Sequence, residues 1–191
     1  MISDMSTGTI PKKLFTADDY YRMWEVGILP EDGRFELIRG EIIEMPLPGR
    51  PHRSRVDRLN QLFCLALGKS AIVRVQNAVP LDRYSVPVPD LTLLKPRADF
   101  YEASDAAPED IFLIVEVSDT TVWYDTNVKA PLYASAGIGE YWQLDVQKRV
   151  LIVCTEPSEG EYRNVRTLHP DDTIRPQRLP DVAFRIDEMI G

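Results

Sequence analysis

Residues 111–118 read IFLIVEVS and form the most apolar segment of the chain. Five apolar residues precede Glu116 in this segment, a pattern that predicts a central strand covered on both faces. Because side chains alternate along a strand, one face is expected to carry Phe112, Ile114, Glu116 and Ser118. A lone carboxylate buried on such a strand is costly or takes up a proton. Glu116 therefore needs a cation or another partner.

Asp90 is the first candidate neighbour of Glu116. Two prolines precede the stretch LTLL at 91–94, which predicts a short strand that begins after Asp90. If 91–94 pairs antiparallel with 111–117, the start of one strand lies beside the end of the other. Two carboxylates at one edge disfavour joint ionisation unless a divalent metal intervenes, and hard oxygen ligands suit Mg²⁺ or Mn²⁺.

Lys129 is the third candidate. A helix is expected from about 127 to 136, with Gly137 as its cap. Helical spacing places Lys129 on one face with apolar neighbours, namely Leu132, Tyr133 and Ala136. If this face packs on the sheet, the ammonium points toward the carboxylates, where it can orient water or stabilise charge on a phosphate. In the alternative, Lys129 pairs with Asp125 on a solvated surface.

The other segments alternate between helical and strand patterns, which predicts an α/β (α+β) protein. Helices are expected over 16–26 and 51–67, and strands at 71–79, 141–146 and 149–154. FELIRGEIIEMP (35–46) predicts two further strands that turn at Arg39-Gly40, and short strands are expected in 156–191. We expect a flexible arm at 1–13, followed by a single domain over 14–191.

Net charge, apolar runs and cysteine count argue against several classes of protein. The chain has 191 residues and a net charge of −8, which argues against a general nucleic-acid coat protein but leaves room for a local basic patch. It contains no apolar run of the ~20 residues needed to cross a bilayer, and its first residues lack a secretory signal, so a cytoplasmic protein without a membrane partner is expected. Cys64 and Cys154 are too few for a disulfide framework or a zinc cage, and both are expected to be buried.

Three stretches of the sequence are similar to a known family. PDLTLL (89–94), IVEVSDTTVWYDTNVKAPLYASAGIGEYWQLD (114–145) and FELIRGEIIEMP followed by His52 resemble the Uma-two family of restriction-endonuclease-like proteins. The resemblance extends from about Phe15 to the C-terminus. That family belongs to the PD-(D/E)XK nuclease superfamily, so the resemblance implies a mixed β-sheet flanked by helices, with additional N- and C-terminal strands.

The resemblance also implies roles for individual residues. Asp90 and Glu116 correspond to the metal ligands, with the carbonyl of Val117 beside them. The superfamily's lysine usually stands where this chain has Ser118, and in this family it is understood to have moved to the following helix, at Lys129. Glu36 corresponds to an upstream glutamate that completes the acidic cluster; the alternative is a solvent-facing residue in an alternating strand.

Four residues are expected to support the site from beside it: His52, Gln76, Ser118 and Asp125. His52 lies on the apolar stripe of its helix, where a core histidine is the commoner outcome, although its place at the helix start suits the edge of a site. The only local basic concentration is formed by Arg50, Arg53, Arg55 and Arg58. A solvated helix face is its default interpretation, and phosphate contact is the alternative.

The leading hypothesis is an Mg²⁺-dependent or Mn²⁺-dependent endonuclease that hydrolyses phosphodiester bonds of DNA. A non-catalytic binding or regulatory module that keeps the nuclease fold is the first alternative, supported by the acidic net charge. A metal-dependent hydrolase of a small phosphoester is the second. A homo-oligomer, with a dimer favoured, is also expected, because a second subunit could extend the groove.

Overall fold

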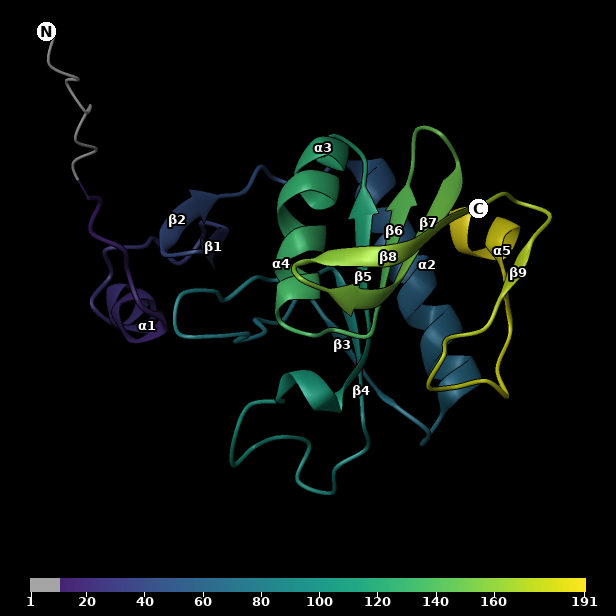
Figure 1. Cartoon of the computed structure of the whole chain (residues 1–191), viewed down its shortest axis with the longest axis horizontal. Coiled ribbons are helices and arrows are strands. Elements are labelled where there is room, and N and C mark those ends of the chain that lie inside the picture. Colours follow the sequence, from purple (N-terminus) through teal and green to yellow (C-terminus); the bar gives the residue numbers. More distant parts are fainter. Residues whose placement is uncertain (1–10) are drawn as a thin grey trace, which may run out of the picture.

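The computed structural model describes residues 11–191 and is organised around a six-stranded mixed sheet with the order β3-β4-β5-β6-β7-β8 (Figure 1). The strands are β3 (Ile72–Val75), β4 (Leu91–Leu94), β5 (Ile111–Ser118), β6 (Glu140–Asp145), β7 (Val150–Ser158) and β8 (Glu161–Leu168). Only β5 and β6 run parallel; the other neighbours are antiparallel. A parallel pair needs a crossover connection, and here the crossover is helical. The predicted mixed sheet is confirmed.

The crossover segment covers one face of the sheet and contributes a side chain to the site. It consists of α3 (Val122–Tyr124), a π-helical turn η2 (Asp125–Lys129) and α4 (Ala130–Ser135). Ala130 closes the π turn by donating its N–H to the carbonyl of Asp125, five residues back. The wider turn comes just before Pro131, which has no N–H to continue a regular helix. Asp125 and Lys129 are both buried in this turn.

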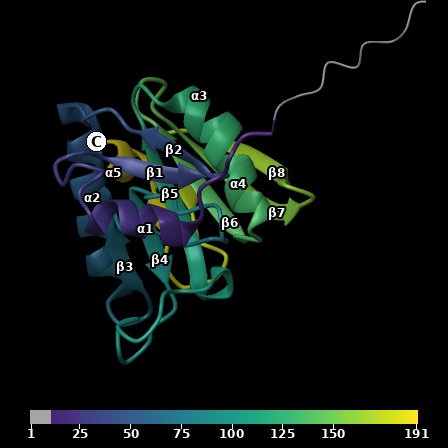
Figure 2. The same ribbon diagram turned by 90° about the vertical axis from the view of Figure 1, so that its left-hand side faces the viewer.

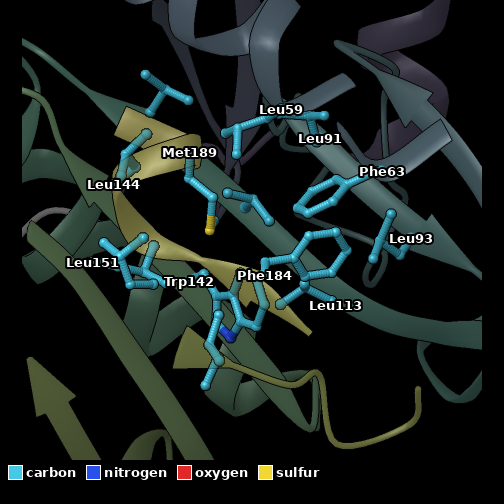
Figure 3. Packing of buried hydrophobic residues seen from close by; sticks show 14 of the residues in the cluster. Leu59, Phe63, Leu91, Leu93, Leu113, Trp142, Leu144, Leu151, Phe184 and Met189 are labelled. Carbon is cyan, nitrogen blue, oxygen red and sulfur yellow. The ribbon is translucent and has the colours of Figure 1, made fainter. Parts of the chain in front are cut away.

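The opposite face of the sheet carries the main apolar core. It is covered by α2 (Arg50–Leu67) and α5 (Ile186–Ile190), with Phe63 of α2 packed edge-on against Phe184 at 5.0 Å between ring centroids. Figure 3 shows these rings together with Trp142 of β6 and Leu113 of β5. Burial of this many large apolar groups fixes the sheet between the two layers.

The N-terminal part forms a smaller unit beside the main sheet (Figure 2). Helix α1 (Ala17–Glu25) packs against the hairpin of β1 (Phe35–Ile38) and β2 (Glu41–Glu44). Thr16 caps α1 through a capping box with Asp19. The segment before β4 joins this unit to the sheet, because Val86 donates its N–H to the carbonyl of Leu37 at 2.7 Å. The additional N-terminal strands are therefore present.

The C-terminal segment adds a second small sheet of β9 (Thr173–Ile174) and β10 (Phe184–Arg185), as expected. A short 3₁₀ turn, η1 (Pro108–Asp110), precedes β5. Within 11–191, no helix is long and apolar enough to cross a membrane. The predicted flexible arm falls largely on residues 1–10, which lie outside the described part of the chain.

Four details of the sequence prediction are wrong. The strand expected at 71–79 ends at Val75, because Gln76 adopts a φ of +52° that breaks the extended backbone. The helix expected at 127–136 begins at Val122, because the β-branched and aromatic residues at 122–124 have low helix propensity and do not indicate a helix in the sequence. Phe112 packs with the main core rather than on the Glu116 face, since the β4–β5 pairing shifts register between Leu93 and Leu94. Cys64 is exposed rather than buried.

Candidate functional site

The antiparallel pairing of β4 and β5 brings Asp90 and Glu116 to one edge, as the sequence predicts. Leu91 stands opposite Val115, so the residue before β4 faces the end of β5. The Asp90 N–H donates to Oε2 of Glu116 at 3.3 Å, and the Val117 N–H donates to Oδ2 of Asp90 at 2.9 Å. Asp90 and Glu116 are 5% and 3% exposed, so two carboxyl groups are buried side by side.

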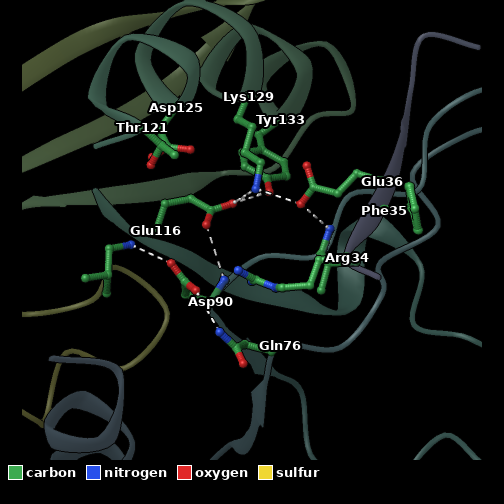
Figure 4. Close-up of polar contacts among 12 residues, drawn as sticks. Arg34, Phe35, Glu36, Gln76, Asp90, Glu116, Thr121, Asp125, Lys129 and Tyr133 are labelled. Atoms are coloured by element: carbon green, nitrogen blue, oxygen red, sulfur yellow. Dashed lines mark hydrogen bonds and ion pairs between the residues drawn. The ribbon is translucent and has the colours of Figure 1, made fainter. Parts of the chain in front are cut away.

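Lys129 reaches the same place from the crossover helix. Its Nζ donates to Oε1 of Glu116 at 2.9 Å and to Oε1 of Glu36 at 2.8 Å (Figure 4). The lysine is 2% exposed, so the alternative of a solvated pair with Asp125 is wrong. Its apolar neighbours Leu132 and Tyr133 are buried, and Tyr133 packs in the core under the crossover, so this helical face and its ammonium point inward.

Glu36 comes from β1 of the N-terminal unit and is 2% exposed, which overturns its solvent-facing alternative. Its Oε1 accepts a second hydrogen bond from the Val88 N–H at 3.0 Å. Its Oε2 is buried without a hydrogen-bond partner among residues 11–191. A buried carboxylate oxygen without a donor is costly, so Glu36 has unused capacity to bind a cation or a water molecule.

His52 and Gln76 both hold Asp90. The Nε2 atom of His52 lies 3.0 Å from Oδ2 of Asp90, and the amide of Gln76 donates to Oδ1 at 3.3 Å. His52 sits in the first turn of α2, so it is placed at the edge of the site rather than in the apolar core. Around it, Arg50, Arg53 and Arg58 are exposed and Arg55 is half-buried.

Asp125 and Ser118 form a neighbouring polar group under the crossover. Oδ2 of Asp125 accepts hydrogen bonds from the hydroxyls of Ser118 and Thr121, both at 2.6 Å. Gln143 on β6 donates to the Ser118 hydroxyl at 3.0 Å, which ties this group to the parallel strand. Ser118 therefore anchors the crossover segment to the sheet through Asp125 and Gln143.

Tyr133 is a site residue that the sequence interpretation treats only as a packing residue. Its hydroxyl donates to Oε1 of Glu116 at 2.7 Å, and its ring is completely buried. The available signal is spacing, because Tyr133 lies four residues after Lys129 on the same helical face. Val88, which contributes only its backbone N–H, carries no such signal.

The local charges explain how these groups titrate. Burial raises the pKa of Glu116 well above its ordinary value, with the Lys129 ammonium opposing. Burial also raises the pKa of Asp125 against the charge of Lys129. For Lys129, burial is the largest single influence and lowers the pKa, but the carboxylates of Glu116, Glu36 and Asp125 outweigh it and hold the pKa well above its ordinary value. Lys129 therefore stays protonated.

Asp90 behaves differently from Glu116. Burial is again the largest influence and raises its pKa, yet the hydrogen bond and charge of His52, the Val117 N–H and Lys129 together hold the pKa below its ordinary value. Asp90 is therefore an ionised carboxylate at neutral pH, the form that binds a metal, whereas a metal ion at Glu116 would favour release of the proton that burial retains there.

These groups open onto a cavity of about 220 Å³. Glu36, Asp90, Glu116 and Lys129 line this cavity, together with the segment 45–49, Thr120 and Thr121. Arg34 and the first turn of α2 at His52 also line it. The buried carboxyl groups and the Lys129 ammonium are thus accessible from the cavity, the carboxyl groups to a metal ion and the ammonium to an anionic ligand.

The donor set fits a hard divalent cation, although residues 11–191 contain no group of three or more His, Cys, Asp or Glu side chains already arranged around one point. Oε2 of Glu116 and Oδ1 of Asp90 each receive one long hydrogen bond of 3.3 Å, and Oε2 of Glu36 receives none. Carboxylate oxygens with spare lone pairs are the ligands that Mg²⁺ prefers. Several carboxylates facing one lysine also favour an added positive charge.

Comparisons with known proteins identify the fold and the family of this chain. In fold, the chain is similar to a crystal structure described as a putative nuclease belonging to DUF820 from Anabaena variabilis, with a TM-score of 0.70 and 16% sequence identity. The similarity covers 92% of this chain and 97% of that chain. No curated protein matches the sequence. The profile of the Uma2 family, described as "putative restriction endonuclease", matches residues 17–187, and this chain therefore belongs to that family.

Proposed function

We propose that this protein is a divalent-metal-dependent phosphodiesterase that cleaves DNA. The observation that carries the proposal is the convergence of Glu36, Asp90, Glu116 and Lys129, from four separate segments, at one cavity. Two adjacent carboxylates with a lysine beside them form a site suited to metal-assisted hydrolysis of a phosphodiester. Membership of the family supports a nucleic-acid substrate.

The proposed roles follow from the contacts of each residue. Asp90 and Glu116, with the Val117 carbonyl, would hold Mg²⁺ or Mn²⁺, which when bound polarises a phosphate and lowers the pKa of a water ligand. Lys129 would place its ammonium against the charge that develops on the phosphate. Glu36 and Tyr133 position Lys129 and Glu116, while His52 and Gln76 orient Asp90.

The acidic net charge does not prevent a local contact with DNA. Arg34 lines the cavity, and Arg50 and Arg53 lie on the α2 turn that reaches it. Arginine contacts phosphate strongly through paired hydrogen bonds, so a few side chains at the rim suffice to position a backbone. Because the basic area is small, few phosphates are contacted, so binding is expected to weaken only modestly as the salt concentration rises.

The test is cleavage of plasmid and single-stranded DNA with Mg²⁺ or Mn²⁺ by the wild type, Asp90→Asn and Lys129→Met. Asp90→Asn preserves shape and removes the charge, so cleavage is expected to fall by at least ~100-fold. Lys69→Met, at an exposed position away from the site, is the matched control and should cleave as the wild type does.

Equal cleavage by all four proteins would indicate a contaminant and contradict the proposal. If no protein cleaves DNA but the wild type turns over a generic chromogenic phosphodiester, the substrate is a small phosphoester. If the folded wild type neither cleaves DNA nor turns over that phosphodiester with either metal, the chain is a binding module that retains the nuclease fold.

A further inference from the structure

A second cavity, of about 460 Å³, lies next to the carboxylate site, between helix α1 and the β1–β2 hairpin. Its lining is dominated by aromatic rings: Tyr20, Tyr21 and Trp24 from α1 and Phe35 from β1. Tyr20, Trp24 and Phe35 also belong to the core of the N-terminal unit, so one side of each ring is supported by packing. We call this space the aromatic cavity.

The rings of the aromatic cavity are held in place. The buried Tyr20 hydroxyl donates to the Phe35 carbonyl at 2.9 Å, and Trp24 makes edge contacts with Tyr20 at 6.3 Å and with Phe35 at 5.8 Å between centroids. A Cβ on Gly33 would clash with the Phe35 ring, so the glycine permits the position of that ring. Tyr21 is 39% exposed at the mouth. The cavity is thus a preformed aromatic surface rather than a loose gap.

The aromatic cavity and the carboxylate site share a wall. Arg34 and Glu36 line both spaces. Gln76 lines the aromatic cavity and also donates to Asp90. Figure 4 shows Phe35 beside Glu36, and Gln76 beside Asp90. A molecule in the aromatic cavity would therefore be separated from the carboxylates by single side chains.

We propose that the aromatic cavity binds an unpaired nucleobase of the nucleotide adjacent to the phosphate held at the carboxylate site. This inference rests on the proposed function and specifies its substrate. A nucleotide has a planar ring and a phosphate separated by one sugar, which matches an aromatic cavity next to an acidic metal site. Aromatic side chains bind bases by stacking, and Arg34 and Gln76 supply polar groups for the base edge or the backbone.

The consequence is a strand preference. A base inside a duplex is stacked on both faces and must leave the helix before it can enter such a cavity. DNA that is single-stranded, or that carries an unpaired base, avoids this cost. The protein is therefore expected to bind such DNA more tightly than a fully paired duplex.

The test uses a short single-stranded oligonucleotide that carries the fluorescent base analogue aminopurine, with Ca²⁺ present to suppress cleavage. Stacking on aromatic rings quenches its emission, so binding to the wild type should quench it. Tyr21→Ala and Trp24→Leu should weaken binding by roughly 5- to 140-fold, the range expected on loss of one stacking aromatic. Phe100→Ala, which removes a 68% exposed aromatic outside both cavities, should bind as the wild type does.

Two results would overturn the inference: binding of the single strand unchanged in both variants, or equal binding of the matched duplex. Trp24→Leu keeps an apolar side chain at that position, and Tyr21 lies at the surface, so folding, checked by circular dichroism, is expected to survive in at least one variant. Absence of cleavage together with variant-sensitive quenching contradicts the proposed function alone. Cleavage of duplex and single strand at equal rates, unaffected by either variant, contradicts the base site alone.

Discussion

Two sides of the same sheet bury carboxylates in different ways. On the core side, Glu140 is 2% exposed, and each of its oxygens accepts a hydrogen bond from a neutral donor: the Trp142 indole at 2.8 Å and the Gln177 N–H at 2.7 Å. On the site side, Glu36 and Glu116 are buried to a similar degree but share the ammonium of Lys129. One oxygen of Glu36 has no partner in the described part of the chain.

The difference shows what separates a structural carboxylate from a functional one. Glu140 connects β6 to the C-terminal segment, and its hydrogen-bonding capacity is used inside the protein. The site carboxylates keep oxygens available at the cavity, which is useful only if a cation or substrate completes their coordination. Burial alone does not identify a site; the partners of the buried group do.

The largest effect is expected from Lys129→Met. Removing the ammonium leaves Glu36 and Glu116 buried without their shared counter-ion, so the free energy of unfolding should fall by about 3–5 kcal/mol. The double variant Lys129→Met with Glu36→Gln should recover part of this loss. Urea unfolding of both measures the effect; a loss below 1 kcal/mol in the single variant would mean that the ion pairs are not formed as described.

A matched pair on β5 tests the two sides directly. Leu113→Ala opens a cavity in the core and should lower stability by about 2–5 kcal/mol. Glu116→Gln keeps the volume, and Lys129 retains Glu36, so stability should stay within about 1 kcal/mol of the wild type while cleavage falls at least ~100-fold. Thermal unfolding and cleavage assays on both variants measure these effects. Full activity of Glu116→Gln would contradict the distinction between a structural core side and a functional site side of the sheet.

Tyr133→Phe removes one donor from Glu116 without changing the packing of the ring. Because that hydrogen bond is made to a buried carboxyl, stability should fall by about 1–2 kcal/mol. The affinity for Mn²⁺ should fall by roughly tenfold, since Tyr133 positions a proposed ligand. Tyr162→Phe, whose hydroxyl donates to the Ile138 carbonyl at 2.9 Å, is the control and should leave metal affinity unchanged.

The smallest effect is expected on the pH dependence of stability, through the core-side carboxyl of Glu140. Burial raises the pKa of Glu140, although the hydrogen bonds from Gln177 and Trp142 oppose the rise. The folded protein therefore binds this proton more readily than the unfolded chain, and stability associated with Glu140 increases as pH falls through its raised pKa. Between neutral and mildly acidic pH, the free energy of unfolding of the wild type should rise by about 1 kcal/mol relative to that of Glu140→Gln. Urea titrations at several pH values measure this difference, and a flat difference would contradict it.

Much of the fold could be predicted from periodicity. The buried strand at 111–118, the antiparallel partner at 91–94 and the position of Asp90 beside Glu116 all follow from local patterns. The burial of Lys129 followed from the apolar members of its helical face. These inferences depend on residues close together in the sequence or on a single strand pairing.

The rest depends on distant contacts that leave no local signal. The burial of Glu36 results from docking of the N-terminal unit onto the sheet, which an alternating strand pattern does not specify. The early start of the crossover is stabilised by Gln143, which donates to the Val122 carbonyl at 3.1 Å and accepts from the Thr126 hydroxyl at 2.9 Å. Tertiary hydrogen bonds of this kind override the weak helix propensity of 122–124.

The most direct test of the central claim is calorimetric titration of Mn²⁺ into the wild type, Asp90→Asn and Glu140→Gln. Both variants convert a buried carboxyl to an amide, one at the site and one in the core. The account predicts that the wild type and Glu140→Gln bind Mn²⁺ with similar affinity, and that Asp90→Asn binds it at least tenfold more weakly. Equal binding by all three proteins, or no binding by the wild type at millimolar Mn²⁺, would contradict it.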